Sequence, residues 1–215
     1  MMFPAFSLGL LLAPYAAAQT IGGVTQTWRV PQAYPEGIAY DKANKRILLS
    51  SVTSNKIMTL DPAKDMAVQT VYTPDTENPS SLGLKVDEST GQVWVTTTDL
   101  FVRDYGGVAL YDMPVSDSET ATAQVMAQYT FPCTVFNSKN QCLFTNDLVI
   151  VNGLPYVADS VSGLVYKIEN DTVKMVSNDP LLYSDNIGPN GILYDERGFL
   201  IVASSSNNKQ LSGSN

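Results

Sequence analysis

The chain has 215 residues, of which 44% are hydrophobic and 16% are charged, a composition typical of globular proteins that predicts a single folded domain. Its formal net charge of −8 at pH 7 disfavours nucleic acid and anionic membrane surfaces as partners, because both attract basic proteins. The sequence contains no histidine, which excludes a Ser-His-Asp or Cys-His mechanism, an imidazole general base and a histidine-ligated zinc site.

The first 20 residues, MMFPAFSLGLLLAPYAAAQT, have the pattern of a secretory signal peptide, although the usual basic start is missing. An apolar stretch around residues 8–12 precedes Ala16, Ala17 and Ala18, and small residues of this kind mark a signal peptidase site. The stretch is shorter than the roughly 20 residues that span a bilayer. We therefore expect a signal peptide at residues 1–18, cleavage after Ala18, and a secreted domain at residues 19–215.

Secretion would also explain the two cysteines, Cys133 and Cys142. An oxidising compartment lets two cysteines this close in sequence form a disulfide, and we expect one here. The alternative is a pair of buried free thiols. Asn170, followed by Asp171 and Thr172, forms an N-glycosylation sequon and predicts a glycan at that position.

Four stretches of the chain repeat one pattern of short strands separated by polar turns. They begin with PEGIAYD at 35–41, SLGLKVD at 81–87, TNDLVIV at 145–151 and PNGILYD at 189–195. Aligning them places Glu36, Leu82, Asn146 and Asn190 at equivalent positions, 46, 64 and 44 residues apart. A period of about 40 to 50 residues built from short antiparallel strands predicts an all-β protein, a β-propeller with one blade per repeat.

The longest spacing and the end of the chain both depart from the repeat. The 64-residue step contains both cysteines, so we expect their disulfide in a long loop that leads to Asn146. The fourth repeat stops at SSSNNKQLSGSN, and residues 23–30, GVTQTWRV, read as a strand that would close a ring. About four blades are present, which indicates an incomplete propeller, either a truncated chain or an open arc with exposed strand edges.

Equivalent residues of a propeller lie on a circle around its axis, so Glu36, Asn146 and Asn190 are expected to meet at the mouth of the central channel. One carboxylate and two amide oxygens suit a hard divalent cation, Ca²⁺ first and Mg²⁺ or Mn²⁺ as alternatives. Leu82 interrupts this circle. The competing interpretation is local: the asparagines form Asx turns and Glu36 is a solvated turn residue.

Several aspartates in the repeats have a structural interpretation. Asp41, Asp87 and Asp195 recur five residues after the circle position, which predicts a repeated turn-capping role. We also interpret Asp147 and Asp159 as turn residues rather than as catalytic groups.

The motifs PEGIAYD, TNDLVIVNGLPYVADSVSG and GPNGILYDERGFLIVA resemble the SMP-30/gluconolactonase/regucalcin group and, more loosely, strictosidine-synthase-like and paraoxonase-like propellers. The resemblance covers most of residues 34–206. It implies a six-bladed propeller that hydrolyses lactones with one divalent cation, held by Glu36 as the acidic ligand and Asn146 as the middle amide ligand. Asn190 stands where this group usually has an aspartate that also helps to activate water, and Leu82 stands where it usually has an asparagine.

Two functions follow from these observations. The first is a secreted, divalent-metal-dependent hydrolase of lactones or related esters, acting on a small-molecule substrate. The second is a non-catalytic propeller that binds a small molecule or a protein, because an amide at Asn190 cannot remove a proton from water. A third interpretation is an inactive truncated fragment, and the sequence leaves the catalytic residues, the substrate and the oligomeric state open.

Overall fold

The computed structural model describes residues 30, 33–54, 56–64, 67–72, 80–115, 118–205 and 210–214, without the side chains of residues 67, 72 and 210–214. The chain divides into two units, residues 1–30 and 31–215, and every described strand belongs to the second. The predicted signal peptide at 1–18 and, apart from Val30, the predicted strand at 23–30 lie outside the described residues. Within the described part, no helix has the length and apolarity needed to cross a membrane.

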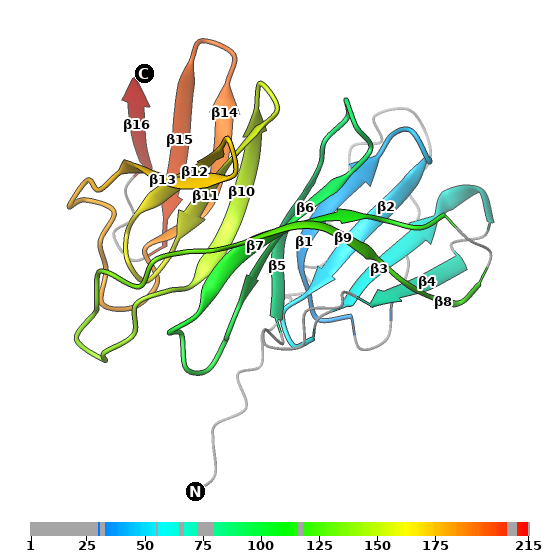
Figure 1. Ribbon diagram of the computed structural model, residues 1–215, viewed down its shortest axis with the longest axis horizontal. Helices are drawn as coiled ribbons and strands as arrows, with labels where there is room; N and C mark the ends of the chain where they lie inside the picture. The colour runs from blue at the N-terminus through cyan, green and yellow to red at the C-terminus, as the bar shows by residue number, and fades with distance from the viewer. Residues whose placement is uncertain are drawn as a thin grey trace, which may run out of the picture. The chain divides into compact units, whose positions relative to one another are not determined.

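The described residues of the second unit form four sheets (Figure 1), each of which begins with the strand predicted from a repeat. The first sheet comprises β1 (Pro35–Asp41), β2 (Arg46–Ser51), β3 (Lys56–Asp61), β4 (Ala67–Tyr72) and the parallel β8 (Thr120–Thr122), with a short 3₁₀ helix at Pro62–Lys64. The second comprises β5 (Ser80–Val86), β6 (Val93–Thr98), β7 (Gly106–Asp112) and β9 (Gln124–Thr130). The third comprises β10 (Thr145–Val151), β11 (Leu154–Asp159), β12 (Val165–Glu169) and β13 (Thr172–Ser177). The fourth comprises β14 (Pro189–Asp195), β15 (Phe199–Ser204) and β16 (Gln210–Ser214).

The first strands of successive sheets lie side by side. Strand β1 contacts β5, β5 contacts β10, and β10 contacts β14, although none of these pairs is hydrogen-bonded into one sheet. This is the radial arrangement that the repeats predict, with β1, β5, β10 and β14 as the inner strands. It brings the four equivalent sequence positions to neighbouring strands.

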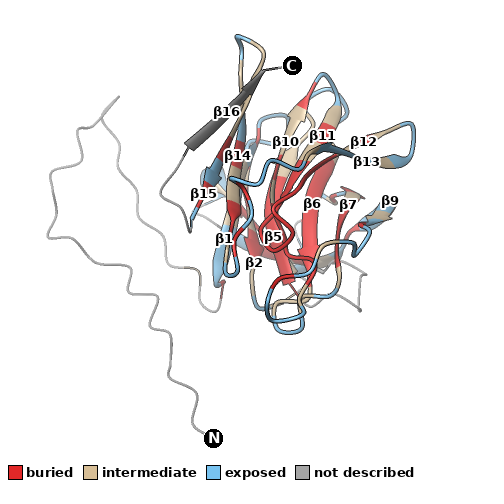
Figure 2. Ribbon diagram, turned by 90° about the vertical axis from the view of Figure 1, so that its left-hand side faces the viewer, coloured by how far each residue is buried: buried red, intermediate tan, exposed pale blue. Residues whose placement is uncertain are grey.

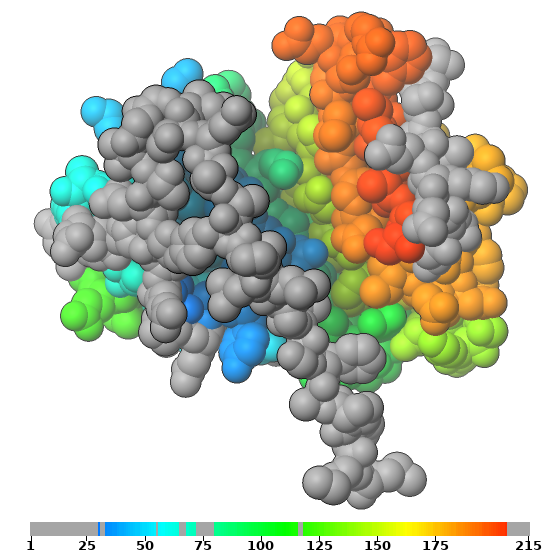
Figure 3. Space-filling model, turned by 180° about the vertical axis from the view of Figure 1, so that it is seen from behind, coloured from blue at the N-terminus to red at the C-terminus, as the bar shows by residue number. Residues whose placement is uncertain are grey.

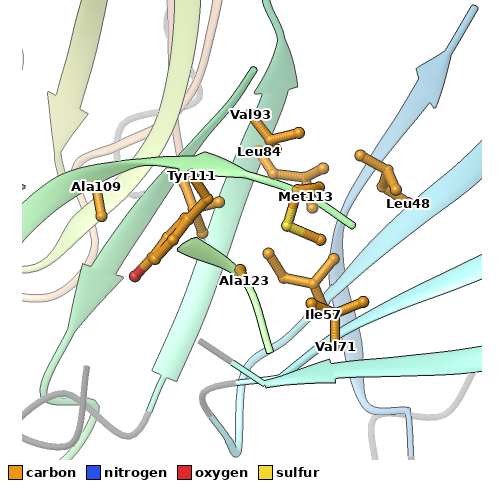
Figure 4. Packing of buried hydrophobic residues seen from close by; sticks show 10 residues of the cluster. Leu48, Ile57, Val71, Leu84, Val93, Ala109, Tyr111, Met113 and Ala123 are labelled. Atoms are coloured by element: carbon orange, nitrogen blue, oxygen red, sulfur yellow. The ribbon is translucent and has the colours of Figure 1, made fainter. Parts of the chain in front are cut away.

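A separate hydrophobic cluster fills each space between successive sheets. Leu48, Ile57 and Val71 of the first sheet pack against Leu84 and Val93 of the second (Figure 4). Corresponding clusters join the second sheet to the third and the third to the fourth, and the buried residues of Figure 2 follow these sheet faces. Burial between neighbouring sheets therefore stabilises the fold, as expected for a repeat architecture in which each unit packs against the next.

Each inner strand has an irregularity in its pairing with the second strand of its sheet. The register shifts lie between residues 35 and 38, 81 and 84, 145 and 147, and 189 and 191, close to the four equivalent positions. Gly83 lies at one of them, where an added Cβ would be 2.6 Å from the Cα of Asp147. Glycine here lets two inner strands approach closely, because no side chain separates their backbones.

The predicted turn-capping aspartates are confirmed. The carboxylates of Asp41, Asp87 and Asp195 each accept a hydrogen bond from a backbone N–H two or three residues further along the chain, at 2.9 to 3.1 Å. The third repeat needs no such aspartate, because its hairpin turns at Asn152 and Gly153, which both have positive φ, 52° and 77°.

The predicted disulfide between Cys133 and Cys142 is confirmed, and its two Cα atoms are 5.3 Å apart. It lies in the loop between β9 and β10, as the long repeat spacing indicated. The side-chain oxygen of Asn137 accepts hydrogen bonds from the backbone of Lys139 and Gln141, both at 2.9 Å, inside the disulfide loop. These bonds order the loop shortly before Asn146.

Candidate functional site

The predicted site residues all lie near the start of an inner strand. Glu36, Asn146 and Asn190 are the second residues of β1, β10 and β14, and Leu82 is the third residue of β5. Leu82 is buried against Phe144 and Val161, so the second sheet contributes an apolar side chain at this level. Asn190 is half-buried, and its amide donates a hydrogen bond to Ser205 Oγ at 2.8 Å.

Asn146 is only 3% exposed, and hydrogen bonds fix the orientation of its amide. Its Nδ2 donates to Ser160 Oγ at 3.0 Å, and the Ser160 hydroxyl donates in turn to the carbonyl oxygen of Pro189. Because the serine proton is used in that second bond, Ser160 acts as the acceptor toward Asn146. The Oδ1 atom of Asn146 is then left buried without a hydrogen-bond partner, which generally costs about 1 to 3 kcal/mol when nothing fills the site.

Other buried polar atoms without a partner occur at the same end of the inner strands. They are the hydroxyl oxygens of Ser81, of Thr97 opposite it, and of Ser204, which pairs with Pro189. Buried polar groups are normally paired with protein, water or an ion. Their position near Asn146 therefore indicates a polar site rather than a fully packed core.

Glu36 has an unusual electrostatic environment. The residue is exposed overall, but the protein around its carboxyl removes enough water to raise its pKa to about 7. The negative charge of Asp147 raises this pKa further, and the positive charge of Lys85 opposes the increase. Strands β1, β5 and β10 thus bring two carboxyl groups and one ammonium group into mutual influence.

Asp147 corrects one of the sequence predictions. It is not a turn residue: it lies within β10, its Oδ2 accepts a hydrogen bond from the backbone of Ile192 in β14 at 3.2 Å, and its Oδ1 lies 3.9 Å from Lys85 Nζ in β5. The sequence does mark Asp147 as different from a repeated structural residue, since the other three repeats carry glycine at this position, namely Gly37, Gly83 and Gly191.

The interpretation of Asp159 as a turn residue is confirmed. Its carboxylate is fully buried and accepts hydrogen bonds from the backbone of Phe144, Val161 and Ser162 and from the Ser162 hydroxyl, at 2.8 to 3.1 Å. Burial raises the pKa of Asp159, against the effect of these hydrogen bonds. The side chain ties the end of β11 to the segment that leads into β10.

The available donors limit what this site can bind. Among the described residues, no three histidine, cysteine, aspartate or glutamate side chains gather in a metal-binding group. A cation bound here would therefore need amide or backbone oxygens beside the carboxylate of Glu36. Carboxylate and amide oxygens suit Ca²⁺ better than a soft transition metal.

The chain resembles several solved structures in its backbone. It matches the crystal structure of a nidogen/laminin complex with a TM-score of 0.57 at 15% identity, over 83% of this chain and 58% of that one. It matches a gluconolactonase from Xanthomonas campestris with a TM-score of 0.55 at 16% identity, over 84% and 61% of the two chains. The β-propeller domain of Cps50 (Swd1) from Myceliophteria thermophila gives 0.53 at 13% identity, over 82% and 52%.

The fold is a β-propeller. Its four sheets confirm the fold class predicted from the repeats, and the chain spans somewhat more than half the length of the solved propellers it matches. No protein-family model matches the sequence, and no curated protein matches it. At these low identities, the resemblance to gluconolactonases is supported for the fold and not for the activity.

Proposed function

We propose that this protein is a secreted hydrolase of lactones or related esters that depends on a divalent cation, Ca²⁺ first, held by Glu36, Asn146 and Asn190. The supporting observation is the buried, unpartnered Oδ1 of Asn146, whose amide is oriented by Ser160. A cation would pair that oxygen and would favour the charged form of Glu36. When bound, such a cation polarises a carbonyl group and lowers the pKa of water.

Asp147 supplies the base that the sequence lacks at Asn190. An amide cannot accept a proton from water at neutral pH, whereas a carboxylate can. Asp147 follows Asn146 directly, and its carboxylate lies between β5 and β14, where Lys85 and the Ile192 N–H hold it. In this proposal Asn190 helps to bind the cation, and Asp147 accepts the proton of the attacking water.

The second candidate is a propeller that binds a small molecule or a protein without catalysis. Leu82 favours it, because the apolar side chain removes a polar contact from the circle of inner-strand positions. The same cation site would then organise a binding surface. The two candidates share the cation and differ only in turnover.

Calorimetric titration and thermal unfolding with Ca²⁺ and with Mn²⁺ test the cation site. We expect a rise in melting temperature, equivalent to about 2.7 kcal/mol at a hundredfold excess over Kd, and at least tenfold weaker binding in Glu36→Gln and in Asn146→Ala. Asn186→Ala, in an exposed loop, is the matched control. If the wild-type protein shows no heat of binding and no shift in melting temperature with either cation, the proposed cation site is wrong.

A panel of lactones and esters then separates the two candidates. Hydrolysis by the wild-type protein that Asp147→Asn abolishes while cation binding persists supports the hydrolase. Cation binding without turnover, in the wild type and in Asn190→Asp alike, favours the binding function.

A further inference from the structure

The first sheet exposes an apolar face, whereas the corresponding face of each later sheet is buried. Ile38, two residues after Glu36, is 66% exposed. Its equivalents in the second, third and fourth repeats are Leu84, Leu148 and Ile192, which are 1%, 0% and 5% exposed. Tyr40 on the same strand is also exposed. One position of the repeat therefore has opposite environments in the first sheet and in the other three.

The partner that buries each equivalent residue is always the preceding sheet. Leu84 packs with Leu48 and Ile57 of the first sheet. Leu148 packs with Trp94 and Val108 of the second, and Ile192 packs with Ala158 and Val165 of the third. The face of the first sheet that carries Ile38, Tyr40 and Leu49, here called the leading face, corresponds to the face that packs on the preceding sheet in the other three.

The fourth sheet carries the complementary surface. In the second and third sheets, the face toward the next sheet is formed by the cross-strand pairs Lys85–Trp94 and Val149–Tyr156. The equivalent pair in the fourth sheet is Leu193–Ile201, and Leu193 is 52% exposed. Figure 3 shows residues of the fourth sheet, coloured orange to red, at the molecular surface. The face with Leu193 and Ile201 is here called the trailing face.

We propose that the leading face of one copy binds the trailing face of a second copy. This contact continues the packing that already occurs three times within the chain, with the same strands and the same repeat positions on each side. It is head-to-tail, so it closes into a ring if the rotation allows. Two copies would place twice the four described sheets around one centre, within the range of typically four to eight blades seen in propellers.

Light scattering coupled to gel filtration, over a wide range of protein concentration, tests this contact. We expect a dimer in the wild type and at least tenfold weaker association in both Ile38→Lys and Leu193→Lys. Met175→Lys is the matched control, because it places the same charge on an exposed apolar residue of β13 outside both faces. Both tested positions are more than half exposed, so the variants should keep the wild-type circular dichroism spectrum.

Mixing the two variants gives the decisive result. Ile38→Lys retains its trailing face and Leu193→Lys retains its leading face, so a mixture of the two can form one unaltered contact and should regain the dimer that each lacks alone. A symmetric contact between two leading faces would be lost in Ile38→Lys but kept in Leu193→Lys, which overturns the proposal. A wild-type protein that stays monomeric at every concentration overturns the proposal as well. If Ile38→Lys then also lowers the melting temperature, residues of the same chain cover the leading face.

Discussion

Asp41 and Arg46 show how a turn residue acquires a second role in one copy of the repeat. Both side chains are buried, and Arg46 Nε donates to Asp41 Oδ2 at 2.8 Å. Arg46 also donates to the carbonyl oxygens of Met113 and Pro114, which tie the first hairpin to the segment after β7. Burial alone would raise the pKa of Asp41, but hydrogen bonds from Asn44 and Arg46 outweigh it and lower the pKa.

Replacing Asp41 by asparagine should therefore destabilise the protein by about 3 kcal/mol at neutral pH, because a buried arginine loses its counter-charge. The contribution of Asp41 is complete above its ordinary pKa of 3.8 and is lost as the pH falls through the lowered, folded-state value. Denaturant unfolding at neutral and at acidic pH should show the difference from wild type shrinking in acid. Asp87→Asn, at the equivalent exposed turn without an arginine partner, should cost less than about 1 kcal/mol, and equal costs would contradict this explanation.

At the scale of the strands, the inner-strand irregularities bring backbones of neighbouring sheets together. Hydroxyl groups reinforce the approach: Ser50 Oγ donates to the carbonyl oxygen of Leu82, and Thr96 Oγ1 donates to that of Asn146 at 2.7 Å. Gly83 lies between these contacts, close to Asp147 and Asn146. The close approach, rather than any unusual backbone conformation, explains this glycine.

Gly83→Ala should destabilise the protein by about 1 to 3 kcal/mol, because the added methyl group meets the Asp147 backbone at 2.6 Å and the neighbouring strand must move. Calcium binding should weaken as well, since Asn146, whose carbonyl oxygen would lie 2.8 Å from the added methyl group, would shift. Gly153→Ala is the control: its added Cβ meets nothing within 4 Å, and only its φ of 77° opposes alanine, at about 1 kcal/mol. Chemical denaturation of both variants measures the contrast, and unchanged calcium affinity in Gly83→Ala would argue against the proposed role of this strand contact.

For the whole molecule, the repeat in the sequence was sufficient to predict the fold, because four copies of one strand pattern can bury their faces only by packing against one another. The contacts of Asp147 could not be predicted from the repeat. Its contacts with Lys85 and Ile192 join three sheets, and they depend on the register between inner strands that no local pattern encodes. The orientation of Asn146 likewise depends on Ser160, fourteen residues away, and on a carbonyl oxygen of the next sheet.

The same architecture predicts that stability is uneven across the sheets. Among the described residues, the cluster between the third and fourth sheets contains five buried residues, whereas each of the two other inter-sheet clusters contains ten. A sheet that packs on one neighbour through a small cluster should open at a lower free energy than one packed on both sides. Hydrogen exchange of the monomer should therefore be faster in β14 and β15 than in β5 and β6.

Two matched truncations separate local opening from global unfolding. Val202→Ala, at the interface of the fourth sheet, should accelerate exchange in β14 and β15 and leave β6 unchanged. Val95→Ala, in the cluster between the first two sheets, should accelerate exchange in β1, β2, β5 and β6 and leave β14 and β15 unchanged, because it weakens a different interface. Uniform acceleration by Val202→Ala would instead mean that the four sheets unfold as a single cooperative unit, since the loss of one small interface would then be felt in every strand.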